Sequence, residues 1–140
     1  DTCAYIGAAA GRLPPAAKAL LGTAIQYHCA ASLGEIATGI GNLPPTRPDY
    51  AAVRTHYTGL IAAIPAGRVL APNERDWIDG GLLAGALARR QNFQPHQRRE
   101  ALIDALIYVC AARAGLPVLT EDGDFDLLQQ MFPSGTVIFY

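Results

Sequence analysis

The sequence predicts an α/β protein: a three-layer α/β/α sandwich with a parallel sheet of about five strands. The main observation is that helix-like and strand-like patterns alternate along the chain, as expected when helices connect parallel strands. The length of 140 residues, with 51% hydrophobic and 16% charged residues, fits one globular domain with a real core. We therefore expect residues 1–140 to form a single domain.

The first half of the chain has signals for three helices and two strands. A pair of prolines opens a helix over residues 14–21, and residues 23–30 have the composition of a buried strand. Ser32 begins the next helix. Apolar residues then recur at helical spacing over residues 52–64, and residues 68–71 form a candidate short strand.

The second half predicts two long helices, over residues 73–91 and 96–114. The first opens with an Asn-x-x-Asp pattern that resembles a helix cap, and the second stops at a glycine that is soon followed by proline. Two strands complete the prediction, at residues 118–120 and 136–140, with a short helix between them at residues 124–131.

The composition argues against several classes of protein. Three cysteines without Cys-x-x-Cys spacing argue against a disulfide framework and a zinc site, and fit a reducing cytoplasm. The richest apolar stretch carries charged residues and a proline, so we expect no membrane span, and the start of the chain does not resemble a signal peptide. The net charge of -1 gives no protein-wide basic field, but two arginine pairs form a local cluster suited to RNA phosphates: Arg89, Arg90, Arg98 and Arg99. A solvated charged face explains that cluster equally well.

Five carboxylates stand in neighbourhoods that indicate a shared site: Asp1, Glu35, Asp104, Asp122 and Asp124. Acids without matching basic partners repel one another, so a cation must offset their charge if folding gathers them. Oxygen ligands favour a hard divalent cation such as Mg²⁺ or Mn²⁺. The pattern therefore indicates a metal-dependent phosphodiesterase.

Asp104 is the most informative of these acids because it is the only charged residue between Glu100 and Arg113, in an otherwise apolar helix. A buried carboxylate needs a partner or a raised pKa. One alternative to metal binding is an ion pair with an arginine, for which Arg98, Arg99 and Arg113 are the candidates.

The other acids also have structural alternatives. Ser32-Leu-Gly-Glu35 fits a capping box, and Asp122 or Asp124 fits a helix N-cap. These roles are compatible with a site at the carboxyl ends of the strands. Thr120 is expected to support a neighbouring carboxylate through a hydrogen bond.

Together these motifs resemble a PIN domain, and most closely the VapC-type toxins of prokaryotic toxin–antitoxin pairs. The matching pieces cover almost the whole chain: Asp1-Thr2, Ser32-Leu-Gly-Glu35-Ile, Asp104-Ala-Leu-Ile and Leu119-Thr120-x-Asp122-x-Asp124-Phe125. The resemblance implies an α/β/α sandwich whose acids hold one or two Mg²⁺ or Mn²⁺ ions and whose activity is hydrolysis of RNA by a metal-activated water. Asp1, Glu35, Asp104 and Asp122 would be the principal acids, Asp124 a fifth and Thr120 a supporting residue.

The resemblance also implies partners. The protein would act on RNA, be inhibited by a cognate antitoxin whose tail covers the acidic cleft, and form a homodimer through apolar helix faces. Two alternatives remain: a DNA- or structure-specific nuclease on the same fold, and a non-catalytic α/β interaction module in which the acids are caps and ion pairs. In an enzyme the acids converge, whereas in such a module they scatter.

Overall fold

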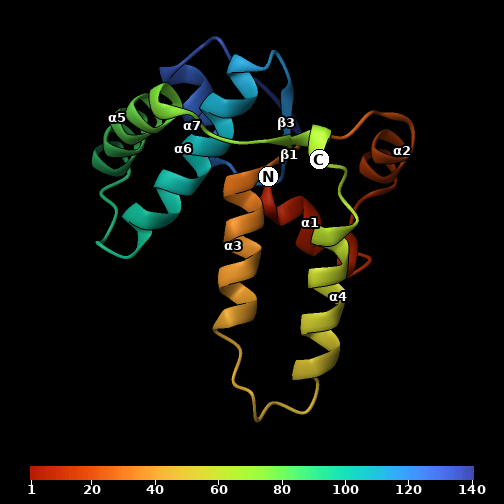
Figure 1. Cartoon of the computed structure of the whole chain (residues 1–140). Helices are drawn as coiled ribbons and strands as arrows, with labels where there is room; N and C mark the ends of the chain where they lie inside the picture. The colour runs from red at the N-terminus through yellow and green to blue at the C-terminus, as the bar shows by residue number, and fades with distance from the viewer.

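The structure is a computed structural model that describes residues 1–140, and it is mainly helical (Figure 1). Its strands form two separate parallel pairs, β1 with β2 and β3 with β4. In chain order the elements are α1 (Thr2–Ala9), α2 (Pro15–Thr23), β1 (His28–Cys29), α3 (Ala30–Gly41), α4 (Tyr50–Ala62), the 3₁₀ turn η1 (Ala66–Arg68), β2 (Val69–Leu70), α5 (Glu74–Arg90), α6 (Gln97–Arg113), β3 (Pro117–Thr120), α7 (Asp124–Met131) and β4 (Thr136–Phe139).

The prediction of a three-layer α/β/α sandwich with about five parallel strands is therefore wrong. β1 and β2 contain two residues each and β3 and β4 four each, and no ladder joins the two pairs. The predicted strand over residues 23–30 is reduced to His28–Cys29 because Thr23 stays in α2, where its hydroxyl donates to the carbonyl of Ala19 at 3.1 Å. The Gln26 side chain also bonds back to the carbonyl of Leu21, at 2.8 Å.

Most of the predicted helices form close to their expected positions. Local signals explain this agreement: Asn73 and Asp76 make a reciprocal capping box at the start of α5, and Gly115 takes a φ of 66° just after α6. Two details differ. Helix α1 was not predicted, and α3 begins at Ala30 without a side-chain cap, so the Ser32–Glu35 capping box does not form.

Helix α6 lies at the centre of the core. Seven of its residues are buried, namely Ala101, Ala105, Leu106, Ile107, Tyr108, Val109 and Cys110. Helix α5 packs closely against it at Gly80, where an added Cβ would lie 3.1 Å from a Leu106 methyl carbon. On another side, Tyr108 meets the ring of Phe125 from α7 edge-on and donates a hydrogen bond to the carbonyl of Phe132 at 2.7 Å.

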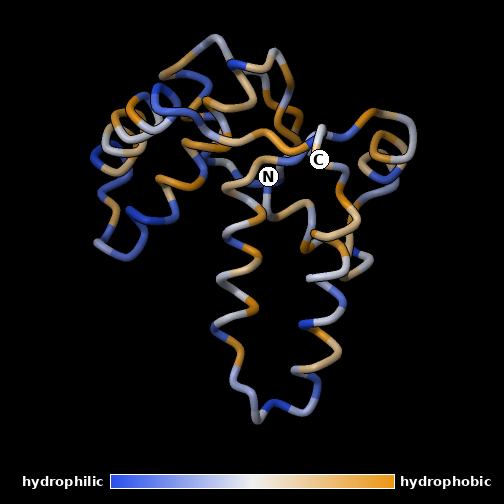
Figure 2. The backbone as a smooth tube through the Cα atoms, viewed as in Figure 1, coloured by the Kyte–Doolittle hydropathy of each residue, from blue (hydrophilic) through white to orange (hydrophobic).

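Helices α3 and α4 run side by side away from this body and form a projecting hairpin (Figure 1). Hydrophobic and hydrophilic residues are interspersed along both (Figure 2). No residue of α4 is buried, and Leu60 at its end is 44% exposed. None of the helices combines the length and the apolar character needed to cross a membrane.

An ion pair between a buried carboxylate and an exposed arginine connects α5 to α6. Asp76 is only 3% exposed, and its carboxylate accepts hydrogen bonds from the Asn73 amide at 2.8 Å and from Arg113 Nε at 2.9 and 3.0 Å. Arg113 also donates to the carbonyl of Ala71 at 3.3 Å. Asp76 thus caps one helix and holds the end of the other.

We expect Asp76→Ala to lower the free energy of unfolding by about 2–3 kcal/mol, because it removes a helix cap and leaves the Arg113 guanidinium without its partner. Asp79→Ala is the matched control, since Asp79 forms an i,i+4 pair with the exposed Arg75 and should cost only about 0.5 kcal/mol. Urea denaturation measures both losses. Equal losses would show that the Asp76 pair contributes no more than a surface pair.

Candidate acidic active site

A cleft of about 640 Å³ opens between the projecting hairpin, the start of α1 and the helix α6. All five acids singled out in the sequence line it: Asp1, Glu35, Asp104, Asp122 and Asp124. They come from the N-terminus, α3, α6, the segment that joins β3 to α7, and the first residue of α7. The chain therefore brings together carboxylates that lie up to 123 positions apart in the printed sequence.

Asp1 is held by several hydrogen bonds. Its side chain caps α1 by accepting from the Thr2 amide, while its Oδ2 accepts from Thr120 Oγ1 at 2.7 Å and from Cys3 Sγ at 2.8 Å. Thr120 is fully buried and also accepts from the Asp122 amide at 2.9 Å. Thr120 thus connects the end of β3 to both Asp1 and the Asp122 turn.

Glu35 and Asp104 have no such partners. Neither side chain makes a hydrogen bond or an ion pair, although both are partly buried. Arg113, one alternative partner for Asp104, is bound to Asp76 instead. Arg98 and Arg99, the other candidates, are exposed and form no salt bridge, so the predicted alternative of an Asp104 ion pair is wrong.

The electrostatics of the cleft follow from this lack of counter-charge. Burial removes the Asp104 carboxylate from water and, with repulsion from Asp122 and Glu35, raises its pKa to about 7. Burial also raises the pKa of Asp124, although a hydrogen bond from Gln91 at 3.3 Å opposes that shift. Two acids in one cleft thus hold their protons more tightly than usual.

The α-amino group of Asp1 interacts electrostatically with Asp104 and Glu35. It donates to the carbonyl of Leu119 at 3.2 Å. Its pKa lies below the ordinary value because burial disfavours the charged ammonium more than the neighbouring cysteines and carboxylates favour it. The amine therefore offsets less of the negative charge than a solvated terminus would.

The residues suit a hard cation in their chemistry. Carboxylate oxygens are the ligands that Mg²⁺ and Mn²⁺ prefer, and the cleft lining contains no lysine or arginine to compete for them. The buried hydroxyl of Thr2, which also lines the cleft, has no hydrogen-bond partner. No three His, Cys, Asp or Glu side chains are positioned to hold a metal ion together as they stand. Binding would therefore require the acidic side chains to move toward the ion.

Some cleft residues were not identified as site candidates from the sequence. Glu100 is a sixth acid, and its position four residues before Asp104 on one helix face was the available signal. Cys3 was missed because its role depends on contacts with Asp1 and Thr120, at 2.8 and 3.5 Å. The four arginines of the basic cluster are exposed, and none lines the cleft.

No protein-family model matches this chain, and none of the curated proteins compared with it is similar in sequence.

The raised pKa of Asp104 predicts a pH-dependent cost to folding in the metal-free protein. An acid whose pKa is higher in the folded state favours folding most below its ordinary value near 3.8, and that contribution is lost as pH rises through about 7. Asp104→Asn mimics the protonated acid, so it should raise the melting temperature by about 2–5 °C at pH 8 and change it little at pH 4. Calorimetry across this range measures the difference.

Glu121→Gln is the matched control, because Glu121 is exposed and does not line the cleft. It should show no such pH-dependent gain. A large loss of stability in Asp104→Asn at pH 8 would contradict the electrostatic interpretation of the cleft.

Proposed function

We propose that this chain is a metal-dependent endoribonuclease that hydrolyses RNA phosphodiester bonds. The observation that supports this most strongly is the convergence of Asp1, Glu35, Asp104, Asp122 and Asp124 on one cleft with no basic side chain among them. A non-catalytic module in which the acids serve as scattered caps and ion pairs fits this arrangement poorly.

The five acids would hold Mg²⁺ or Mn²⁺, and the ion when bound would polarise a phosphoryl oxygen and lower the pKa of water. Asp1 is already oriented for this role by Thr120 and Cys3. Asp104, with a pKa of about 7 before any cation binds, and Glu35, which has no internal partner, are the residues able to accept a proton from water.

Residues other than the acids would also contact the RNA. Tyr57 and Phe93 line the cleft and offer faces on which unpaired bases can stack. The exposed arginines at the adjacent ends of α5 and α6 would contact phosphates: Arg89, Arg90, Arg98 and Arg99. A single-stranded substrate suits this combination better than a duplex.

Kinship with PIN domains of the VapC type is part of this proposal. It is supported by the order of the acidic motifs and by their convergence, whereas the two short strand pairs lend it no support. We further propose a cytoplasmic location, an antitoxin whose tail covers the cleft, and a homodimer. The projecting hairpin favours the last two, since it leaves apolar residues of α4 such as Leu60 uncovered.

A DNA- or structure-specific nuclease is the second candidate, because phosphodiester hydrolysis by metal ions needs the same acids. The two stacking positions and the exposed arginines serve either nucleic acid. Parallel assays with single-stranded RNA, single-stranded DNA and structured duplexes of one sequence distinguish the candidates.

We expect the purified protein to cleave single-stranded RNA with Mg²⁺ or Mn²⁺ and to lose all activity in excess EDTA. Asp104→Asn should reduce the cleavage rate by at least about 100-fold. Loss of a metal ligand should lower activity at least as much as loss of a residue that only orients such a ligand. Glu121→Gln should retain the wild-type rate. Undiminished cleavage in EDTA would disprove the metal mechanism.

Binding of the metal can be measured without RNA. Mn²⁺ at about 100 times its dissociation constant should stabilise the folded protein by about 2.7 kcal/mol, seen as a rise in melting temperature. The rise should be much smaller in Asp104→Asn and unchanged in Glu121→Gln. An equal rise in all three proteins would place the ion outside the cleft.

A further inference from the structure

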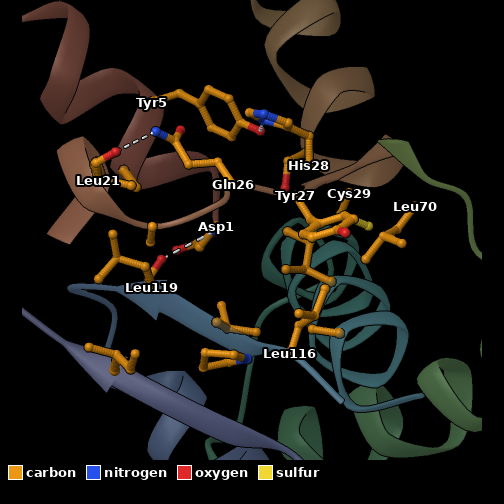
Figure 3. Close-up of a pocket in the computed structure, with 18 of the residues that line it drawn as sticks. Asp1, Tyr5, Leu21, Gln26, Tyr27, His28, Cys29, Leu70, Leu116 and Leu119 are labelled. Carbon is orange, nitrogen blue, oxygen red and sulfur yellow. Dashed lines mark hydrogen bonds between the residues drawn. The ribbon is translucent and has the colours of Figure 1, made fainter. Parts of the chain in front are cut away.

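Two cysteines outside the acidic cleft meet where β1 packs against α6. Cys29 ends β1 and directly precedes α3, and Cys110 lies near the end of α6. Both are free thiols, but Cys110 is fully buried whereas Cys29 is only partly buried. Figure 3 shows Cys29 beside Leu70, its parallel neighbour in β2. The pair thus joins segments that are far apart in the chain.

The two thiols interact directly. Cys110 donates a hydrogen bond to the sulfur of Cys29, and this bond is the main cause that lowers the pKa of Cys29, although burial opposes the shift. The backbone amides of Ala31 and Ser32, at the start of α3, also donate to the Cys29 sulfur. The bond between the thiols, together with burial, raises the pKa of Cys110. Cys29 is therefore the sulfur that ionises, and Cys110 is the sulfur that keeps its proton.

The surroundings of the third cysteine are different. The Cys3 thiol donates to a carboxylate oxygen of Asp1 at 2.8 Å, and no other cysteine contacts it. Cys110, in contrast, accepts from Arg113 Nη2 at 3.5 Å. The guanidinium places positive charge beside the Cys110 sulfur, which favours loss of its proton when that sulfur reacts.

We propose that Cys29 and Cys110 form a reversible disulfide when a hydroperoxide oxidises the protein. The Cys29 thiolate attacks one peroxide oxygen, so an S–O bond forms, the O–O bond breaks and the leaving hydroxide takes up a proton to become water. The Cys110 sulfur then attacks the Cys29 sulfur, the S–O bond breaks, and the hydroxide leaves as water with the Cys110 proton. Overall, two thiols lose two electrons and two protons, and hydrogen peroxide becomes two waters.

The disulfide requires only a local movement. The two sulfurs are already hydrogen-bonded to each other and would approach to about 2.05 Å. The bond would fasten the start of α3 to α6, the two helices that carry Glu35 and Asp104. This inference is independent of the proposed nuclease activity, because it concerns thiol chemistry outside the acidic cleft.

The test treats the fully reduced protein with hydrogen peroxide. Free thiols are then counted in denaturant, and mass spectrometry of proteolytic peptides identifies which cysteines are joined. Three variants are treated in parallel: Cys29→Ser, Cys110→Ser and, as the matched control, Cys3→Ser. Dimedone, which labels sulfenic acids, is added to a second portion of each sample.

We expect the wild type to fall from three free thiols to one, with the Cys29 and Cys110 peptides joined and separated again by dithiothreitol. Cys3→Ser should form the same disulfide. Cys110→Ser should stop at a sulfenic acid on Cys29, and Cys29→Ser should lose thiols at least about 10-fold more slowly. The oxidised wild type should melt about 5 °C above the reduced form, because the bond closes a long loop of the chain.

The peptide map of the wild type decides the proposal even if a variant fails to fold. A wild type that keeps all three thiols would overturn it. A disulfide that includes Cys3, or one that joins two copies of the chain, would also overturn it.

Discussion

Burial of helix α6 on nearly every side is the constraint on which the rest of the structure depends. Helix α5 approaches it at Gly80, α7 meets it through Phe125 and Tyr108, and β3 covers it with Val118. Such close packing leaves little freedom for the helix to rotate. The side of α6 that the core does not cover carries Asp104 and Glu100, and this side forms a wall of the acidic cleft. The position of Asp104 is therefore set by the core rather than by any bond of its own.

That position has an electrostatic consequence. The core holds Asp104 away from water and close to Asp122 and Glu35, while Arg113 at the end of the same helix is paired with Asp76. A protein selected only for stability would not be expected to gather unpaired carboxylates in this way, since each unfavourable contact lowers the stability of the fold. Strained charge arrangements of this kind are found at functional sites, where a ligand or substrate relieves them. The acidic cleft is best understood in those terms.

Most helices and three of the short strands were predicted well from the sequence, whereas the strand over residues 23–30 and the pairing of all strands in one sheet were not, for a physical reason. The limits of α5, α6 and α7 follow from neighbouring residues, such as the Asn73–Asp76 cap and the glycine after α6, so a short window contains the necessary information. A strand depends on a partner elsewhere in the chain. Residues 23–27 have strand-like composition, but Thr23 and Gln26 bond to carbonyls of α2 and only His28 and Cys29 find a partner, in β2.

By itself, the sequence determined most of the helices, the isolation of Asp104 in an apolar segment and the order of the acids, because these are properties of residue type and spacing. Only the tertiary structure decided which charges meet. The sequence alone allows Arg113 to pair with either Asp76 or Asp104. Packing of α5 against α6 places it beside Asp76. In the same way, the contact of α1 with β3 brings Thr120 to Asp1 and Cys3. These pairings depend on distances between segments far apart in the chain, which local patterns do not contain.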